Sequence, residues 1–361
     1  MSLQRLFLSF ISICYSFAAT ATAENTGTAF LKLDSRSYSQ PTSIHSFTHD
    51  FNGSFNKGDY AFTKNQLEIG TRYTNLSISY IARYDQFYSF NEDTARLYYE
   101  IENDLPQTVG QAYKLQIKAN FIRTSGIKLA YNWKTNEAIS INAALSYLSA
   151  DKFFDNLTNG SAVLQDDSLF SADANIHHIA DKDMILEYPA NSADGRGYAM
   201  DIGIHWIFNP QWQLDIQLLD AVSEIEWHDG LDSQLNLTTA TRTFDAEGNL
   251  SVAPALSGRQ ILRNYTQRLP KKFITEISYR LDNQQRIFTE IYHTKYFTHT
   301  QLSYEFMLTQ DQAIALSWNI DTETAGISYQ SDYVSLGLYA DSLDYKKAHA
   351  LNLMMGVNIP F

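Results

Sequence analysis

The sequence contains the residue types that hydrolytic catalysis needs, but none of the local patterns that usually bring them together. It has nine histidines among 361 residues, and serine and aspartate are common. A serine-type hydrolase needs a nucleophile beside a positioned base. The chain shows no G-x-S-x-G elbow, no H-E-x-x-H pair and no glycine-rich phosphate loop. We therefore assign no catalytic residue and no cofactor, and an enzyme is the least favoured class of function.

Oxygen ligands for a divalent cation are concentrated in residues 150–196, which carry nine acidic and three basic side chains. Calcium prefers six to eight oxygen ligands, but no spaced calcium-loop motif is present. His177 and His178 are adjacent, and adjacent side chains of an extended chain rarely face one ion. We predict a solvated acidic loop and no metal site. Binding of a divalent cation or of a partner by this loop stays open.

Charged residues recur at alternate positions in several segments, which predicts strands with one charged face. Residues two apart in a strand lie on the same face. The candidates for lining a water-filled interior are Lys64, Glu68, Arg72, Arg83, Asp85, Arg96, Glu100, Lys114, Lys118, Glu276, Arg280 and Glu305. The basic members cluster early in the chain. They would either create a transverse field that sorts polar solutes or only make the wall rigid through ion pairs.

Apolar residues occupy the positions between these charges, and the helical spacing of three and four fails in each window. The pattern is clearest at the C-terminus, where every second residue from Leu351 to Phe361 is apolar. Short polar turns such as Ser125-Gly126, Asn209-Pro210 and Thr309–Gln312 separate the runs. The predicted strands are 28–38, 59–72, 75–88, 94–102, 111–124, 127–134, 138–149, 197–208, 211–222, 272–281, 286–296, 298–308, 313–321, 325–330, 333–341 and 349–361. This makes about sixteen strands. Fourteen is the alternative, because 28–38 and 94–102 show the weakest pattern.

The composition explains what such strands would build. Apolar residues make up 44% and charged residues 19%, yet the mean hydropathy is −0.29 and no run of about 18 apolar residues follows the first 20. A chain whose strands have one apolar and one polar face can cross a bilayer only as a closed sheet, because every backbone polar group must be paired. We predict an all-β, antiparallel up-and-down transmembrane β-barrel. The net charge of −13 excludes nucleic acid as a partner.

Both ends of the chain favour export to a bacterial outer membrane. Residues 1–23 have a basic start, a short apolar core and an A-x-A-like ending, so we expect a cleaved signal peptide, which removes Cys14, the one cysteine. The last strand, with Val357, Ile359 and the terminal Phe361, resembles the C-terminal strand of Gram-negative outer-membrane β-barrel proteins. That resemblance implies that this strand is the signal read by the barrel assembly machinery. Residues 24–58 would contain the first strand or a short hatch, and residues 59–361 the barrel.

Counting strands backwards from Phe361 predicts which connections share a side. The long segments 150–196 and 223–271 fall on the extracellular side, and the second should contain a hairpin around Asp245–Asn249. The Asn209-Pro210 and Thr309–Gln312 turns fall on the periplasmic side. Trp133, Trp206 and Trp212 border periplasmic turns, which fits an aromatic girdle contacting outer-membrane lipid.

The width of a barrel grows with its strand number, and sixteen strands leave an aqueous channel that wall side chains alone do not fill. We therefore expect a porin-like channel for passive diffusion of small polar solutes, unless a loop or the N-terminal segment blocks it. The runner-up is a surface or adhesion barrel that acts through its two long loops. A transporter for hydrophobic substrates and an outer-membrane hydrolase are less favoured, and the sequence does not reveal an oligomeric state.

Overall fold

The computed structural model describes residues 27–166, 169–183, 193–239, 242–244, 250–252 and 255–361, so the predicted signal peptide and Cys14 lie outside the described residues. Its elements are β1 (Gly27–Ser39), α2 (Ile44–Thr48), β2 (Tyr60–Tyr73), β3 (Leu76–Phe90), α3 (Glu92–Glu102), β4 (Ala112–Lys134), β5 (Ile139–Asp166), β6 (Leu169–Ala180), β7 (Asp194–Ile207), β8 (Trp212–Thr238), β9 (Arg242–Phe244), β10 (Leu250–Val252), β11 (Ala255–Gln267), β12 (Lys272–Arg280), β13 (Gln285–Thr294), β14 (Thr298–Thr309), β15 (Gln312–Asn319), β16 (Thr324–Ser331), β17 (Val334–Ala340) and β18 (Ala350–Pro360). Neither helix among these is long and apolar enough to cross a bilayer.

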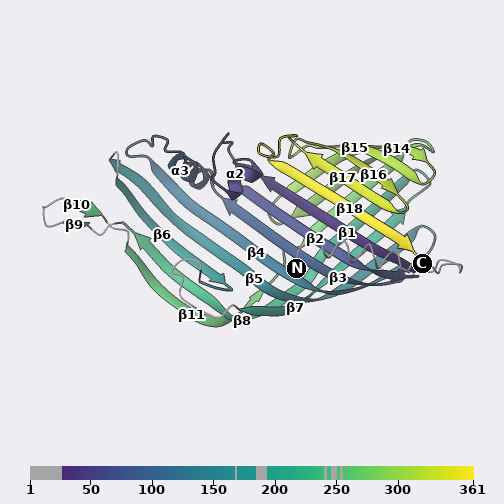
Figure 1. Ribbon diagram of the computed structural model, residues 1–361, viewed down its shortest axis with the longest axis horizontal. Helices are drawn as coiled ribbons and strands as arrows, with labels where there is room; N and C mark the ends of the chain where they lie inside the picture. The colour runs from purple at the N-terminus through teal and green to yellow at the C-terminus, as the bar shows by residue number, and fades with distance from the viewer. Residues whose placement is uncertain (1–26, 167–168, 184–192, 240–241, 245–249, 253–254) are drawn as a thin grey trace.

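Fourteen antiparallel strands of the described chain form a closed ring (Figure 1). The ring runs from β1 to β5, continues through β7, β8 and β12, and ends with β13 to β18. β18 pairs with β1 from Thr28↔Pro360 to Tyr38↔Ala350, which closes it. A closed ring leaves no strand edge unpaired. The all-β, up-and-down barrel is therefore confirmed, with the alternative number of strands.

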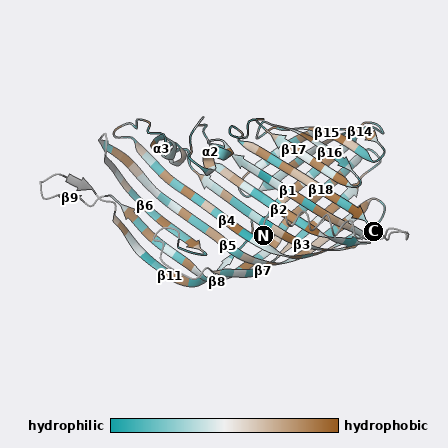
Figure 2. Ribbon diagram, in the orientation of Figure 1, coloured by the Kyte–Doolittle hydropathy of each residue, from teal (hydrophilic) through white to brown (hydrophobic). Residues whose placement is uncertain are grey.

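The two faces of the wall differ in character, as the alternation predicts. Ile78 on β3, Leu129 on β4 and Leu145 on β5 are about half exposed on the outer face, at 53%, 49% and 50%. Arg83 and Lys64, on the opposite face of their strands, are buried. Figure 2 shows apolar and polar residues alternating along the strands. The outer surface thus presents an apolar belt, and the interior collects the charges.

Two predicted strands do not exist as separate wall strands, so the prediction of sixteen is wrong. The segment predicted as 94–102 is the helix α3, capped by Asn91, whose side chain accepts from Thr94 N. Glu92 and Asp93 favour its first turn, because acidic groups there meet the positive end of the helix dipole. The segments predicted as 111–124 and 127–134 are one continuous strand, β4. Each error removes one strand, so the number of strands stays even. The start of β1 and the end of β18 therefore still lie at the same end of the barrel.

Gly126 explains why the Ser125-Gly126 turn was a wrong prediction. It lies inside β4, paired with Ile81 on one side and Leu148 on the other. A Cβ at this position would lie 1.9 Å from the Tyr147 carbonyl oxygen, so no larger residue fits. Glycine inside a strand can mark such a close approach of backbones rather than a turn.

Five strands extend beyond the rim of the barrel and form a structure that we call the tongue. β4, β5 and β8 have 23, 28 and 27 residues, whereas β13 to β18 have between 7 and 12. The outer portion of β4 pairs with β5, β6 pairs with β5 and β8, and β11 pairs with β8, which gives the order β4, β5, β6, β8, β11. Segments 150–196 and 223–271 were predicted to be long loops. Within the described residues they are largely strands of the tongue (Figure 1).

The two ends of the barrel differ as predicted. Gly27, Phe361 and the Asn209-Pro210 and Thr309–Gln312 turns share the end that carries the short connections. The tongue and α2, α3 lie at the opposite end (Figure 1). β9 pairs with β10 at that end, as the predicted hairpin requires, although Asp245–Asn249 lie outside the described residues. Within the segment 24–58, residues 27–39 form the wall strand β1 and not a separate hatch.

Candidate functional site in the barrel interior

A charged cavity occupies the interior at the end with short turns, and we call it the vestibule. Its volume is about 780 Å³, and its lining includes Thr74 and Asn75 of the β2–β3 turn. Strands β1 to β5, β7 and β8 contribute most of the wall. The charged lining residues are Lys32, Asp34, Arg36, Lys64, Glu68, Arg72, Lys128, Lys134, Asp201, Asp215 and Glu290. A second cavity of about 750 Å³, lined by Arg280, Arg286 and Glu305, lies at the same end between the turns of β12 to β17.

Ion pairs cross the interior at the inner end of the vestibule. The Lys64 ammonium donates to Asp34 at 2.7 Å, and Arg36 donates to Asp34 at 3.1 Å. Arg36 also donates to Glu290 at 3.1 Å. Asp34 and Arg36 lie on β1, whereas Glu290 lies on β13, six strands away in the ring. Side chains of the wall therefore meet across the lumen of this fourteen-stranded barrel, whereas the predicted sixteen strands implied an interior that wall side chains alone do not fill.

A buried quartet of charges, Arg83, Asp85, Asp220 and Lys272, joins β3 to β8 and β12. Arg83 donates two hydrogen bonds to Asp220, at 2.7 and 2.8 Å, and one to Asp85 at 2.8 Å. Lys272 donates to Asp220 at 2.9 Å and to Asp85 at 3.0 Å. Buried charges of this kind require partners, because an unpaired one is very costly. The quartet is electrically balanced and closes the space between these strands.

The conformation of Asp220 depends on a local irregularity of the wall. Its φ is 55°, and the pairing of β7 with β8 shifts register between Met200 and Ile202. Its backbone N–H donates to Asp201 at 2.9 Å. Aspartate tolerates the left-handed region better than most residues, because its short side chain bonds locally. This bulge interrupts the alternation, and for that reason the sequence pattern did not reveal Asp220.

Aromatic rings cross the interior above the ion pairs. The β13–β14 turn, residues 295–297, places the Phe297 ring 4.3 Å from the ring of Phe62 on β2, measured between centroids. The neighbouring Tyr296 stacks on Phe87 of β3. His299 accepts or donates a hydrogen bond of 3.0 Å with the Tyr60 hydroxyl. β2 and β13 stand opposite each other in the ring of fourteen, so this turn spans the lumen.

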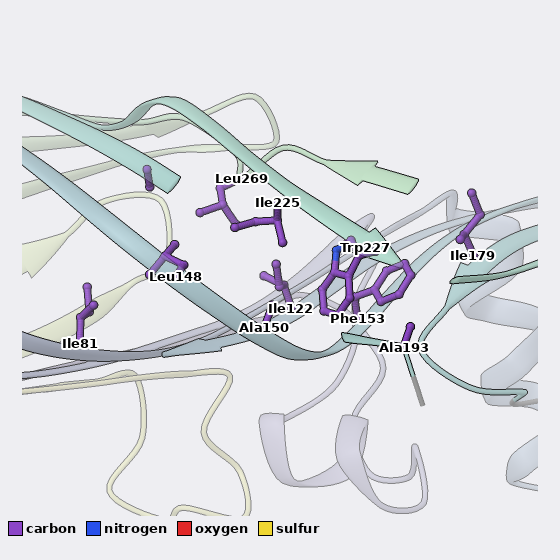
Figure 3. Close-up of a cluster of buried hydrophobic side chains, with 11 residues drawn as sticks. Ile81, Ile122, Leu148, Ala150, Phe153, Ile179, Ala193, Ile225, Trp227 and Leu269 are labelled. Atoms are coloured by element: carbon purple, nitrogen blue, oxygen red, sulfur yellow. The ribbon is translucent and has the colours of Figure 1, made fainter. Parts of the chain in front are cut away.

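An apolar cluster fills the interior where the tongue leaves the barrel (Figure 3). Phe153 on β5 stacks on Trp227 of β8 with ring centroids 4.1 Å apart. Gly195 leaves room for the indole, because a Cβ there would lie 2.8 Å from it. The other members are Ile81, Ile122, Leu148, Ala150, Ile179, Ala193, Ala199, Ile225 and Leu269, with Tyr265 packed against them.

Polar groups at the edge of this cluster are paired. The indole N–H of Trp227 donates to Gln267 at 3.1 Å, and the Tyr265 hydroxyl donates to Asp155 at 2.6 Å. Burial, together with this hydrogen bond to Asp155, raises the pKa of Tyr265 above its ordinary value. The hydroxyl therefore keeps its proton and acts only as a donor to the carboxylate.

Eight of the twelve predicted lumen residues lie on the inner face within the barrel, and the other four lie at its rim or outside it. Those on the inner face of the ring are Lys64, Glu68, Arg72, Arg83, Asp85, Glu276, Arg280 and Glu305. Lys114 lies on β4 beyond the rim, in the tongue, and Lys118 lies at the rim, where it pairs with Ser89 of β3. Arg96 and Glu100 belong to α3, where Arg96 pairs with Asp93 and Glu100 accepts from the Tyr113 hydroxyl. Their spacing of four is helical, and Leu97 packs with Tyr113 and Ala162.

Sequence reasoning missed several charges that the structure brings into the interior. Lys32, Asp34 and Arg36 alternate with Leu31 and Leu33, so the same pattern was present in β1 and could have been used. Lys272 begins β12, and its role depends on the bulged Asp220 opposite. The aromatic turn at residues 295–297 carries no local signal, because its partners come from the other side of the ring.

The three predicted girdle residues lie on the outer face at the end with short turns. Trp133 is 59% exposed and contacts Tyr131. Trp206 packs with Phe208 at 4.0 Å and Trp212 with Tyr279 at 4.7 Å, both measured between ring centroids. The predicted assembly residues Val357 and Ile359 pair with Leu31 and Ala29 of β1. Phe361 and Gly27 exchange backbone hydrogen bonds of 3.0 and 3.1 Å.

The two adjacent histidines face opposite sides of β6. His177 contacts Asp232 at 2.9 Å, whereas His178 is 1% exposed and lies beside the Phe154 ring. Burial lowers the pKa of His178, so its ring is neutral near pH 7. Within the described residues there is no group of three or more histidine, cysteine, aspartate or glutamate side chains that could hold a metal ion.

Comparisons with known proteins give structural likenesses only. No protein-family model matches the sequence, and no curated protein matches it. Among solved structures, the TodX deltaS2S3 mutant, a monoaromatic hydrocarbon channel, aligns over 94% of this chain and 91% of its own, with 10% identity and a TM-score of 0.49. The Ralstonia pickettii toluene transporter TbuX aligns over 94% and 90%, with 10% identity and a TM-score of 0.33. The Escherichia coli outer-membrane protease OmpT aligns over 95% and 99%, with 7% identity and a TM-score of 0.24. At these identities and TM-scores, no function transfers from the likeness.

Proposed function

We propose that this protein is a channel for small polar solutes in the outer membrane of a Gram-negative bacterium, and that contacts across its lumen close it in this conformation. The observation that carries the proposal is the vestibule of about 780 Å³, which is lined by charged groups inside a closed barrel. An apolar outer belt and a polar interior are what a water-filled barrel in lipid requires. A barrel that served only to anchor loops would have no need of a charged cavity of this size.

The closing element is the β13–β14 turn, which we call the gate turn and define as residues 295–297. It crosses the lumen through Tyr296 and Phe297, and its contacts with Phe87 and Phe62 are ring stacking rather than ion pairs. An aromatic pair contributes about 0.5–1.5 kcal/mol beyond its buried area. Contacts of this strength can break and re-form, so the turn can leave the lumen without unfolding the barrel.

The membrane location is part of the same proposal. The apolar belt between the tryptophans near the short turns and Tyr147 and Tyr198 near the tongue would lie in the hydrocarbon layer. Both tyrosines are exposed, at 61% and 41%, as residues of an interfacial girdle are. We expect a signal peptide at residues 1–23 to direct export, and the strand ending in Phe361 to be read by the assembly machinery.

Conductance across a planar lipid bilayer tests the channel. We expect the folded wild-type protein to give single-channel steps with low open probability. Phe297→Ala should raise the open probability, because it removes the ring that stacks on Phe62. Phe306→Ala is the matched control, since Phe306 lies on the outer face of β14 and is 42% exposed. A silent bilayer with both proteins correctly inserted would reject the channel and favour a surface role of the tongue.

A second candidate, a channel for apolar molecules, is favoured by the apolar cluster around Phe153 and Trp227 inside the upper barrel. An apolar ligand that reached this cluster would change the fluorescence of Trp227. We therefore suggest titration of the detergent-solubilised protein with a small aromatic hydrocarbon, with Trp227→Phe as the control. A saturable change that is lost in the variant would favour this candidate over polar solutes.

A further inference from the structure

The vestibule contains three cations without an acidic partner. Lys32 on β1, Arg72 on β2 and Lys134 on β4 all line the cavity. Among the described residues, none of the three has a carboxylate oxygen within 4.0 Å. They lie within four consecutive strands of one wall, β1 to β4, and Arg72 and Lys134 stand next to the short turns at the mouth.

The acids of the same cavity are all engaged. Asp34 pairs with Arg36 and Lys64, and Glu290 pairs with Arg36. The remaining acids are also paired: Lys128 contacts Asp201 at 3.0 Å and Glu68 at 3.8 Å, and His205 contacts Asp215 at 2.8 Å. Six cations and five acids line the vestibule, so with histidine neutral its net charge is +1, although the whole chain carries a net charge of −13.

Phe30 fixes two of these cations in place. The Lys32 ammonium lies 5.4 Å and the Arg72 guanidinium 5.9 Å from the centroid of its ring. Phe30 is 2% exposed and pairs with Gly70 of β2. A cation over an aromatic face is attracted by it but keeps its charge. Lys32 and Arg72 thus stay beside each other with donors available to the cavity.

We propose that the vestibule is a binding site for small anions and makes the channel anion-selective, with Lys32, Arg72 and Lys134 as the residues that attract the solute. Rings or walls of lysine and arginine select anions in pores, and a cavity with low-dielectric walls strengthens their field. Arginine can bind a carboxylate or phosphate with two parallel hydrogen bonds. This inference rests on the channel function proposed above.

The reversal potential in a potassium chloride gradient measures this selectivity. We expect the wild type, or Phe297→Ala if its openings are easier to record, to prefer chloride. The triple variant Lys32→Gln, Arg72→Gln, Lys134→Gln should shift the reversal potential toward cation preference. The matched control is Lys57→Gln, Lys346→Gln, Lys347→Gln, which removes three exposed cations at the opposite end of the barrel. It should leave the reversal potential unchanged.

Calorimetric titration of the detergent-solubilised protein with inorganic phosphate tests the site even if no current flows. We expect saturable binding that the vestibule triple variant loses and the control retains. A conducting protein that prefers cations, or whose selectivity the triple variant leaves unchanged, would overturn the inference while leaving the channel intact. A silent protein that still binds phosphate at these residues would reject the channel and retain the site. Absence of phosphate binding in the wild type would reject the site.

Discussion

Arg36 on β1 and Glu290 on β13 meet across the lumen, with a hydrogen bond of 3.1 Å between the guanidinium and the carboxylate. Arg36 keeps Asp34 as a second partner on its own strand, so losing Glu290 would not leave it unpaired. The contact therefore joins opposite walls without being required for either strand. Substitution of Glu290 should therefore weaken a contact that closes the lumen while it disturbs the fold little.

We predict that Glu290→Gln raises the open probability about fivefold in the Phe297→Ala background, because weakening a charged hydrogen bond costs the closed state about 1 kcal/mol. Single-channel recording measures the effect. Glu137→Gln, in an exposed turn, is the control. Equal open probabilities in all three proteins would show that this ion pair does not contribute to closure.

The buried quartet should matter for stability rather than for gating. Asp220→Asn keeps a side chain that tolerates a φ of 55° but leaves Arg83 and Lys272 with one carboxylate between them. Removing one partner of a buried ion pair costs about 3–5 kcal/mol. We therefore expect a lower midpoint concentration of guanidinium chloride for unfolding. The heat-dependent mobility shift on a gel measures the folded fraction at each concentration.

Asp311→Asn in the exposed β14–β15 turn should leave that midpoint unchanged. If Asp220→Asn fails to fold, Lys272→Met provides a second measurement, because Arg83 alone can still pair with both acids. A quartet variant as stable as the wild type would mean that the pairing is not needed for the fold.

Gly126 and Gly203 give a matched pair for strand packing. A Cβ at Gly126 would lie 1.9 Å from the Tyr147 carbonyl oxygen, whereas the nearest atom to a Cβ at Gly203 is 3.5 Å away. We predict that Gly126→Ala lowers the free energy of unfolding by about 2–4 kcal/mol. Gly203→Ala should be neutral or slightly stabilising, since glycine weakens a strand. Equal midpoints for the two variants in denaturant would contradict the close approach.

The tongue should lose stability in alkaline solution because of Tyr265. Its pKa is raised in the folded state, so its contribution is fully present below the ordinary tyrosine pKa of about 10 and is lost as the pH rises through the higher folded value. The fluorescence of Trp227, taken as the difference between wild type and Trp227→Phe, reports on the cluster. We expect a loss of structure above pH ~10 that Tyr265→Phe removes. A transition that persists in this variant would point to another group.

Much of the wall was predictable because alternation is a local property. Leu351 to Phe361 and the strands around Ile78 and Leu145 show it plainly, and the closed ring follows from the need to pair every edge. The pattern failed where three-dimensional contacts decide the local structure. Gly126 looks like a turn residue, but glycine is required there because the backbone of the neighbouring strand β5 leaves no room for a side chain. Arg96 and Glu100 look like strand charges, but Tyr113 and the cap at Asn91 favour a helix.

The interior was predictable in kind but not in arrangement. The sequence placed charges such as Lys64 and Arg83 on the inner face, because side chains in strands alternate. It could not show that Arg36 reaches Glu290, or that Phe297 reaches Phe62, because these partners are more than 200 residues apart and meet only through closure of the ring. Cross-lumen contacts depend on the shape of the whole barrel, which no window of sequence contains.

The pairing of Gly27 with Phe361 sets the order of events in biogenesis. β1 is synthesised more than 300 residues before β18, the strand with which it pairs to close the ring. One edge of β1 therefore stays unpaired until β18 has been made. A chain truncated before β18 would have two unpaired strand edges, on β1 and β17, and would be prone to aggregate with other copies of itself. The two edges must therefore stay shielded from other strands until the final residues have been delivered.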